Sequence, residues 1–139
     1  FSVPTRETWA RERDIKVAVG AALAAAGAAP DEVVMSLDTG GVKYWTGHPG
    51  VVAPADPIET IEGVARAYGA RWLLVERRDL VPALVPILDG AARPAWVGRP
   101  IWSQAQAPVS DPPDVAPLVG PEAALFPICL DPDDLRCAP

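Results

Sequence analysis

Two cysteines are the residues of this 139-residue chain whose spacing most directly suggests chemistry. Cys129 and Cys137 match neither a CxxC redox pair nor the spacing of a zinc site. Their separation permits a disulfide that would hold the tail against the last strand, and the sequence leaves open whether it forms. A formed bond would favour an oxidising, extracytoplasmic compartment, whereas free thiols would favour the cytosol.

His48 is the only histidine, and Pro49 follows it. Without a second histidine or a nearby cysteine it has no companions for a metal site, so a surface loop histidine is favoured over a ligand or a base. A nucleophilic triad would have to use His48, and no serine or cysteine lies in an elbow pattern. The patterns GxGxxG, GxxxxGK[ST] and HExxH are also missing. The sequence predicts no catalytic residue, cofactor or metal.

Three carboxylates in four residues, at Asp131, Asp133 and Asp134, resemble the start of a calcium loop. The glycine and the distal glutamate of that loop are missing. A solvated turn between the two cysteines is the preferred interpretation.

Asp38 ends a short β-branched run, residues 32–38, that should form the first strand. Ligands of open α/β sheets collect beyond the carboxyl ends of strands, although aspartate is also an ordinary turn residue. Tyr44 and Trp45 follow in a predicted short helical turn, residues 42–49, before a second strand at 50–54, and packing between that turn and the sheet is their favoured role. If the chain has a recognition surface, we expect Asp38, Tyr44, Trp45 and His48 to form it.

The clearest elements are a helix from Pro57 to Tyr68 and the strand after it. Asp56 is a good N-cap, and Gly69 is a good stop signal. Apolar residues recur at three- and four-residue intervals between them. The continuous apolar run 72–75 is typical of a strand buried on both faces, which favours a parallel sheet covered by helices.

The remaining elements are less regular. A helix is predicted from Thr5 or Asp14 to Ala26; the same region resembles a signal peptide, but Glu12 and Asp14 interrupt its basic part. Seventeen prolines gather mainly after residue 81, so the second half should hold less regular structure. We expect a helical segment at 80–88 broken at Pro86, an irregular strand within 93–102, an extended loop at 103–121, and an edge strand at 123–130.

Together these elements predict one α/β domain over residues 1–139. It should have three layers, with a mostly parallel, Rossmann-like sheet of about four or five strands and helices on both faces. The 18 acidic and 12 basic residues give a net charge of −6 without a basic run, which argues against a nucleic-acid partner. The longest weakly polar run, residues 17–30, is too short to span a bilayer. A chain that begins at Phe1 is expected to be a processed product or a piece of a longer protein.

Residues 33–80 resemble a segment of bacterial membrane glycosyltransferases that use polyprenol-phosphate sugars, relatives of protein O-mannosyltransferases and lipid A aminoarabinose transferases. The likeness lies in a strand ending near an acid (33–38), an aromatic turn of Tyr-x-Thr-Gly type at Tyr44, a strand at 51–54, and a helix closing with Tyr-Gly before an apolar strand (65–75). His48 departs from the pattern, because the family commonly has Arg or Lys after Thr-Gly.

The resemblance implies a soluble domain on the extracytoplasmic face of the membrane, following transmembrane helices in the same polypeptide. The catalytic acid of such enzymes lies in the membrane portion, so the resemblance gives this chain no catalytic residue. Its partners would be that membrane portion and a carbohydrate, lipid-linked sugar or protein acceptor. Two other hypotheses are a standalone secreted or periplasmic module that binds a small ligand near Asp38, and a small cytosolic enzyme.

Overall fold

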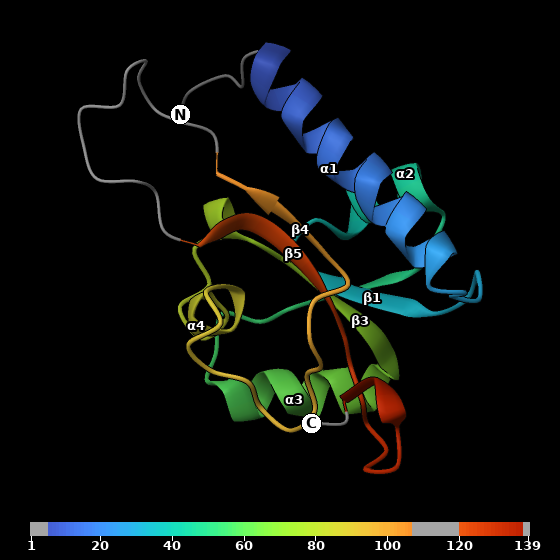
Figure 1. Ribbon diagram of the computed structural model, residues 1–139, viewed down its shortest axis with the longest axis vertical. Coiled ribbons are helices and arrows are strands. Elements are labelled where there is room, and N and C mark those ends of the chain that lie inside the picture. The colour runs from blue at the N-terminus through green and yellow to red at the C-terminus, as the bar shows by residue number, and fades with distance from the viewer. Residues whose placement is uncertain (1–5, 107–119, 138–139) are drawn as a thin grey trace.

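The computed structural model describes residues 6–106 and 120–137, which form one five-stranded sheet with helices around it (Figure 1). The strand order is β2-β1-β3-β5-β4. β1 pairs in parallel with β2 and β3, whereas β5 pairs antiparallel with β3 and β4. The strands are β1 (Val33–Ser36), β2 (Gly50–Val52), β3 (Ala70–Glu76), β4 (Trp102–Ala105) and β5 (Pro121–Pro127).

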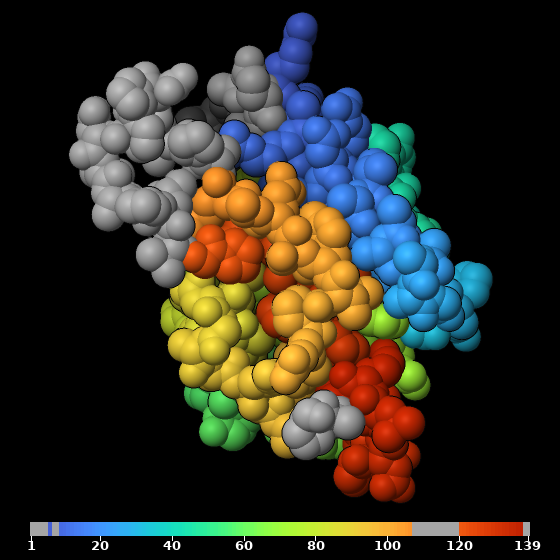
Figure 2. All heavy atoms as spheres, viewed as in Figure 1, coloured from blue at the N-terminus to red at the C-terminus, as the bar shows by residue number. Residues whose placement is uncertain are grey.

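The helices lie in two layers, one on each face of the sheet (Figure 1). α1 (Arg6–Ala25) and α2 (Thr39–Thr46) cover one face, and α3 (Ile58–Tyr68) and α4 (Val85–Leu88) cover the other. Two short 3₁₀ turns, η1 (Arg77–Asp79) and η2 (Leu135–Cys137), follow β3 and end the described chain. In the space-filling view, atoms of α1 (blue) lie beside those of β4 (orange), so α1 extends to the antiparallel edge of the sheet (Figure 2).

Alternation along β3 builds both halves of the core. Trp72 and Leu74 face α1, together with Leu125 of β5. Leu73 and Val75 face the α3 layer. Every β3 residue except Arg71 is buried, which confirms the strand that the continuous apolar run predicts.

Residue spacing also explains the two best-defined helices. On α3, Ile61 and Ala65 are buried, one turn apart, and Gly69 ends the helix with φ 63°, in the left-handed region that glycine adopts without a Cβ clash. The predicted N-cap is wrong by one residue: Pro57 occupies that position, and no side chain bonds the first turn. α1 places Ile15, Val19 and Leu23 on the sheet at intervals of four residues.

Several predicted element boundaries in the second half of the chain are wrong. The predicted loop at 103–121 begins too early and ends too late, because β4 occupies residues up to Ala105 and β5 begins at Pro121; its middle, 107–119, lies outside the described residues. Pro86 does not kink a longer helix but lies in the first turn of α4, where its missing N–H costs nothing. The predicted strand within 93–102 contributes an isolated bridge between Val97 and Ile128.

The last strand is also displaced from its predicted place. β5 lies inside the sheet, between β3 and β4, and not at an edge. Proline is compatible with this position because Pro121 and Pro127 stand at the two ends of the strand. The α/β class with helices on both faces is confirmed; a Rossmann-like sheet is not, because β4 and β5 enter through antiparallel pairings.

Candidate functional site

The four residues predicted for recognition do not converge. Asp38 follows β1 and caps α2, since the Gly41 N–H donates to its Oδ1 over 2.9 Å. α2 then runs back along β1, and His48 lies beyond its far end, beside the residue that precedes β1. Asp38 and His48 therefore lie at opposite ends of the parallel strands: Asp38 at the carboxyl end and His48 at the amino end.

His48 is a structural histidine. Its ring is buried, and its Nδ1 lies 2.9 Å from the carbonyl oxygen of Glu32. Its backbone N–H donates to Thr46 Oγ1, which fixes the turn between α2 and β2. The predicted surface position is therefore wrong, because the ring is packed against the residue that precedes β1.

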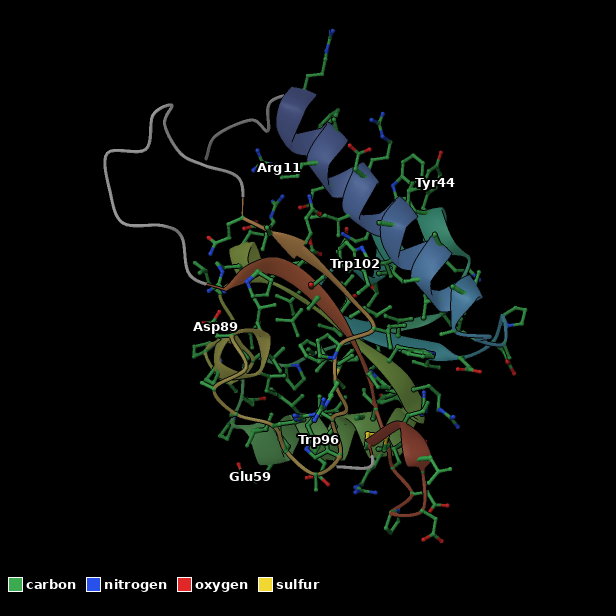
Figure 3. The ribbon with its side chains drawn as sticks, viewed as in Figure 1. Arg11, Tyr44, Glu59, Asp89, Trp96 and Trp102 are labelled. Carbon is green, nitrogen blue, oxygen red and sulfur yellow. A yellow bond between two sulfur atoms is a disulfide. The ribbon has the colours of Figure 1, made fainter. Side chains whose placement is uncertain are left out.

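Tyr44 and Trp45 form an exposed aromatic pair on α2. Their ring centroids are 4.9 Å apart in an edge-to-face arrangement. Tyr44 is 78% exposed and Trp45 42% exposed, so the packing role predicted for them between the helical turn and the sheet is wrong. In Figure 3, Tyr44 lies on the outer side of the helical layer, away from the sheet.

A cluster of charged side chains that sequence reasoning did not single out lies at the carboxyl end of β1 and β3. Its centre is Lys16, whose ammonium is completely enclosed although Asp38 and Arg78 reach solvent. Lys16 Nζ lies 3.0 Å from Glu76 Oε2, 3.1 Å from Glu12 Oε2 and 3.3 Å from Asp38 Oδ2. We call the set the Lys16 cluster; its members are Glu12, Lys16, Asp38, Glu76, Arg78 and Asp79.

The elements place these charges by their ordinary geometry. Glu12 and Lys16 are one helical turn apart on α1. Glu76 follows Trp72 and Leu74 on the same face of β3, so it points toward α1. Arg78, on η1, completes the set by donating to Glu12 Oε1 over 2.7 Å.

Burial and crowding set the protonation of the cluster. Burial raises the pKa of Glu76 to about 7; Lys16 lowers it, but the neighbouring Glu12 and Asp79 add to the rise. Burial also raises the pKa of Asp79, with Glu12 adding to it. For Lys16, burial lowers the pKa, but Glu76 and Glu12 outweigh it, and the net pKa is above the ordinary value. One ammonium therefore stabilises three carboxylates incompletely, and Glu76 is the one whose pKa rises to about 7.

The Lys16 cluster is a set of structural ion pairs that includes one carboxyl group, Glu76, with a raised pKa. Lys16 is unsuited to act as a nucleophile or base, because its raised pKa keeps it charged and its three N–H groups face three carboxylates. Glu76 Oε1 is buried with no hydrogen-bond partner among the described residues, so it can carry a proton near neutral pH. A cavity beside it, lined by Leu37, Glu76 and Asp79 among others, has a volume of only about 10 Å³.

Two sequence signals could have revealed this cluster. Lys16 interrupts the apolar stripe of α1 directly beside Ile15, and a lysine in a buried stripe requires an acidic partner. Glu76 directly follows the continuous apolar run 72–75 and is itself buried. The pairing itself could not be read from the sequence, because the partners are 60 residues apart.

The two cysteines are bonded to each other, which ties η2 to the segment after β5. The three aspartates between them form a turn in which Asp134 binds Arg136 over 2.8 Å. Hydrogen bonds from Arg136 hold the pKa of Asp134 below its usual value. Across the described ranges, no group of three His, Cys, Asp or Glu side chains is arranged to hold a metal ion.

Comparisons do not extend this description. No protein-family model, curated protein or solved structure matches the chain significantly. Among the helices of residues 6–106 and 120–137, none has both the length and the apolar character needed to cross a membrane.

Proposed function

We propose that this chain is the extracytoplasmic domain of a membrane glycosyltransferase that moves a sugar from a polyprenyl phosphate to an acceptor outside the cytoplasm. In this proposal the reacting groups lie in the membrane portion of the same polypeptide. The domain contributes a contact surface for that portion or for the acceptor.

The exposed pair of Tyr44 and Trp45 carries the proposal. It lies in the stretch that resembles these transferases, and its exposure leaves it without a packing role. Aromatic rings with one polar tip are the side chains that stack on sugars and lie at membrane interfaces. The pair therefore supplies a contact surface in the aromatic turn, which is one of the features that the resemblance rests on.

The disulfide supports the proposed compartment. Bonds between cysteines persist in oxidising environments and are rare in the cytosol. The bond between Cys129 and Cys137 is thus expected for a domain outside the cytoplasm.

The standalone ligand-binding module receives less support at its predicted location. The cavity beside Leu37 and Asp79, at the same edge as Asp38, has about the volume of a single water probe. Small-molecule sites are typically cavities of about 300–1,000 Å³. A ligand site near Asp38 would therefore require a rearrangement of the Lys16 cluster.

Size and membrane partition of the native gene product test the proposal. An antibody against this domain should detect a product several times larger than the chain that requires detergent for extraction. A detergent-independent product near the mass of this chain would overturn the proposal and leave the secreted module and the small enzyme as explanations. In the same extract, alkylation of Cys129 and Cys137 before reduction would favour a cytosolic enzyme.

A further inference from the structure

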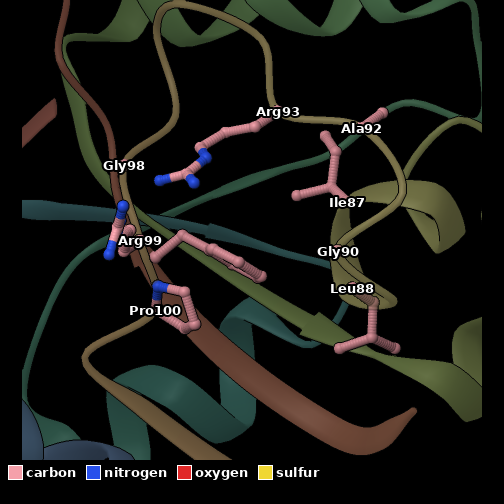
Figure 4. Close-up of a pocket in the computed structure, with 9 residues that line it drawn as sticks. Ile87, Leu88, Gly90, Ala92, Arg93, Gly98, Arg99 and Pro100 are labelled. Atoms are coloured by element: carbon pink, nitrogen blue, oxygen red, sulfur yellow. The ribbon is translucent and has the colours of Figure 1, made fainter. Parts of the chain in front are cut away.

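A cavity between α4 and the 98–100 segment has the size and lining of a small-molecule site. Its volume is about 430 Å³, within the range of ligand pockets. Ile87, Leu88 and Phe126 give it an apolar wall. Arg93 and Arg99 stand on the other side, and Figure 4 shows the side chain of Arg93 extending toward Arg99, opposite Ile87 and Leu88.

The two arginines carry charge that nothing in the described structure neutralises. Neither Arg93 nor Arg99 makes a hydrogen bond or an ion pair with any residue of 6–106 or 120–137. The acidic side chain nearest in sequence, Asp89, is already paired with Arg77. The whole chain has a net charge of −6, but the opening of this cavity carries two positive charges without an acidic partner among the described residues.

The chemistry of the lining defines the ligand. Guanidinium groups bind phosphate through paired N–H donors, and two of them match the charge of a phosphate monoester. The wall of Ile87, Leu88 and Phe126 excludes water and accommodates a hydrocarbon chain. The N–H groups of Gly90 and Gly98 already donate to the carbonyl oxygens of Ile87 and Pro127, so the two guanidinium groups supply the donors for a phosphate.

We infer that this cavity, the arginine pocket, binds a phosphate monoester attached to a short apolar chain. The phosphate lies between Arg93 and Arg99, and the chain lies against Ile87, Leu88 and Phe126. The inference is independent of the proposed function, because a secreted binding module would use the pocket equally.

Titration of the isotope-labelled chain with octyl phosphate, followed by NMR, tests the inference. Saturable shifts are expected for the amides of Gly90 and Gly98. Arg93→Gln combined with Arg99→Gln should weaken binding by about tenfold or more, since both charge-assisted contacts to the phosphate are lost. The matched control is Arg11→Gln, which removes the same charge from an exposed position on α1 and should leave binding unchanged.

Two further comparisons separate the halves of the ligand. Inorganic phosphate and octanol should each bind about tenfold more weakly than octyl phosphate, because each engages only one wall. Ala92→Trp, a change at an exposed position of the rim, should fill the opening and compete with the chain. Equal affinity for inorganic phosphate, or no effect of the paired arginine substitutions, would overturn the inference.

The source of the ligand is decided by a vesicle assay. Vesicles of phosphatidylcholine with phosphatidic acid should retain the chain in an arginine-dependent manner if the pocket takes a lipid headgroup. Binding of octyl phosphate without vesicle retention would identify a freely diffusing phosphate monoester. No saturable shift with octyl phosphate and no vesicle retention would together overturn the inference.

Discussion

Glu76 shows how a single ionisable side chain can link stability to pH. It accepts from Lys16 through Oε2, but Oε1 has no partner in the described structure. Burial raises its pKa to about 7. Glu12 and Asp79 strengthen the effect, because their charges disfavour a third carboxylate beside one ammonium. The ionised form is therefore tolerated at a cost.

The sign of this linkage follows from the two pKa values. The folded state holds a proton on Glu76 up to about pH 7, whereas the ordinary value is 4.5. Between these values the folded state binds more protons than the unfolded state, so the contribution of Glu76 to the unfolding free energy falls as pH rises. It is fully favourable below about pH 4.5 and is lost as the pH passes about 7.

Glu76→Gln should remove this dependence. We expect the unfolding free energy of the native chain, relative to the variant, to decline by roughly 2–3 kcal/mol between pH 5 and pH 8. Urea unfolding at intervals across that range measures it. The limit of pH 5 avoids the titration of Glu12, Glu32 and Asp134, whose lowered pKa values act in the opposite sense at lower pH. A difference between the two proteins that is constant with pH would contradict the assignment.

At the scale of the element, the C-terminal turn is held by three kinds of contact. The disulfide joins Cys137 to Cys129. Arg136 donates to the carbonyl oxygen of Ile128 over 2.7 Å, and its guanidinium lies 5.0 Å from the ring centre of Trp72. η2 thus covers the start of β3 although none of its three residues is buried.

Replacing both cysteines by serine should loosen this turn but leave the sheet folded. The expected loss is about 2–3 kcal/mol of unfolding free energy, the chain-entropy value for a short loop. Urea unfolding measures the loss, and far-ultraviolet circular dichroism checks that the sheet and helices are still folded. A variant as stable as the parent would show that Arg136 alone fixes the turn.

Two glycines offer opposite expectations for the same substitution. A Cβ at Gly98 would lie 2.5 Å from the carbonyl oxygen of Arg136 and 2.7 Å from Pro127 Cγ, so Gly98→Ala should displace η2 and cost about 1–3 kcal/mol. Gly63, on α3, has nothing within 4 Å of that position, so Gly63→Ala should stabilise by up to about 1 kcal/mol. Thermal unfolding of the pair checks both signs. Equal effects at the two sites would contradict the close approach at Gly98.

For the whole molecule, local patterns predicted far more than long-range ones. The helix ending at Gly69 and the buried strand after it follow from residue spacing, and both are present. The position of β5 did not follow, because an apolar run with prolines at its ends suits an edge or an interior place equally. Its antiparallel pairing with β3 depends on residues some fifty positions away, which local propensity does not report.

The candidate site also contains residues that local sequence predicts and residues whose contacts depend on the fold. Asp38 was correctly placed at the carboxyl end of a strand, and its exposed neighbours on α2 lie nearby in sequence. His48 is close to them in sequence, but α2 runs back along β1, so His48 lies at the opposite end of that strand. Lys16 and Glu76 could not be predicted as a pair, because neither local pattern identifies its partner and only the fold brings them together.

Substitution of the aromatic pair tests the surface at the scale of the whole protein. Under the proposed function, Tyr44→Ser with Trp45→Ser in the full-length gene product should reduce sugar transfer by about thirtyfold, since two stacking contacts of about 1 kcal/mol each are lost. Unfolding of the domain should be unchanged, because both rings are exposed. Tyr68→Ser, which removes a ring that is 64% exposed on α3, is the matched control. Equal transfer by all three proteins would remove Tyr44 and Trp45 from the proposed surface.

The interior position of β5 has a consequence for synthesis on the ribosome. When β1, β2 and β3 have emerged, β3 presents an unpaired edge whose partner is encoded some fifty residues later. Such an edge, apolar on both faces, is a template for pairing with other chains. The native sheet therefore cannot be completed until residues 121–127 have emerged, and the unpaired edge of β3 stays exposed during that interval. Fragments that stop before residue 121 should aggregate, whereas the complete chain should refold from urea.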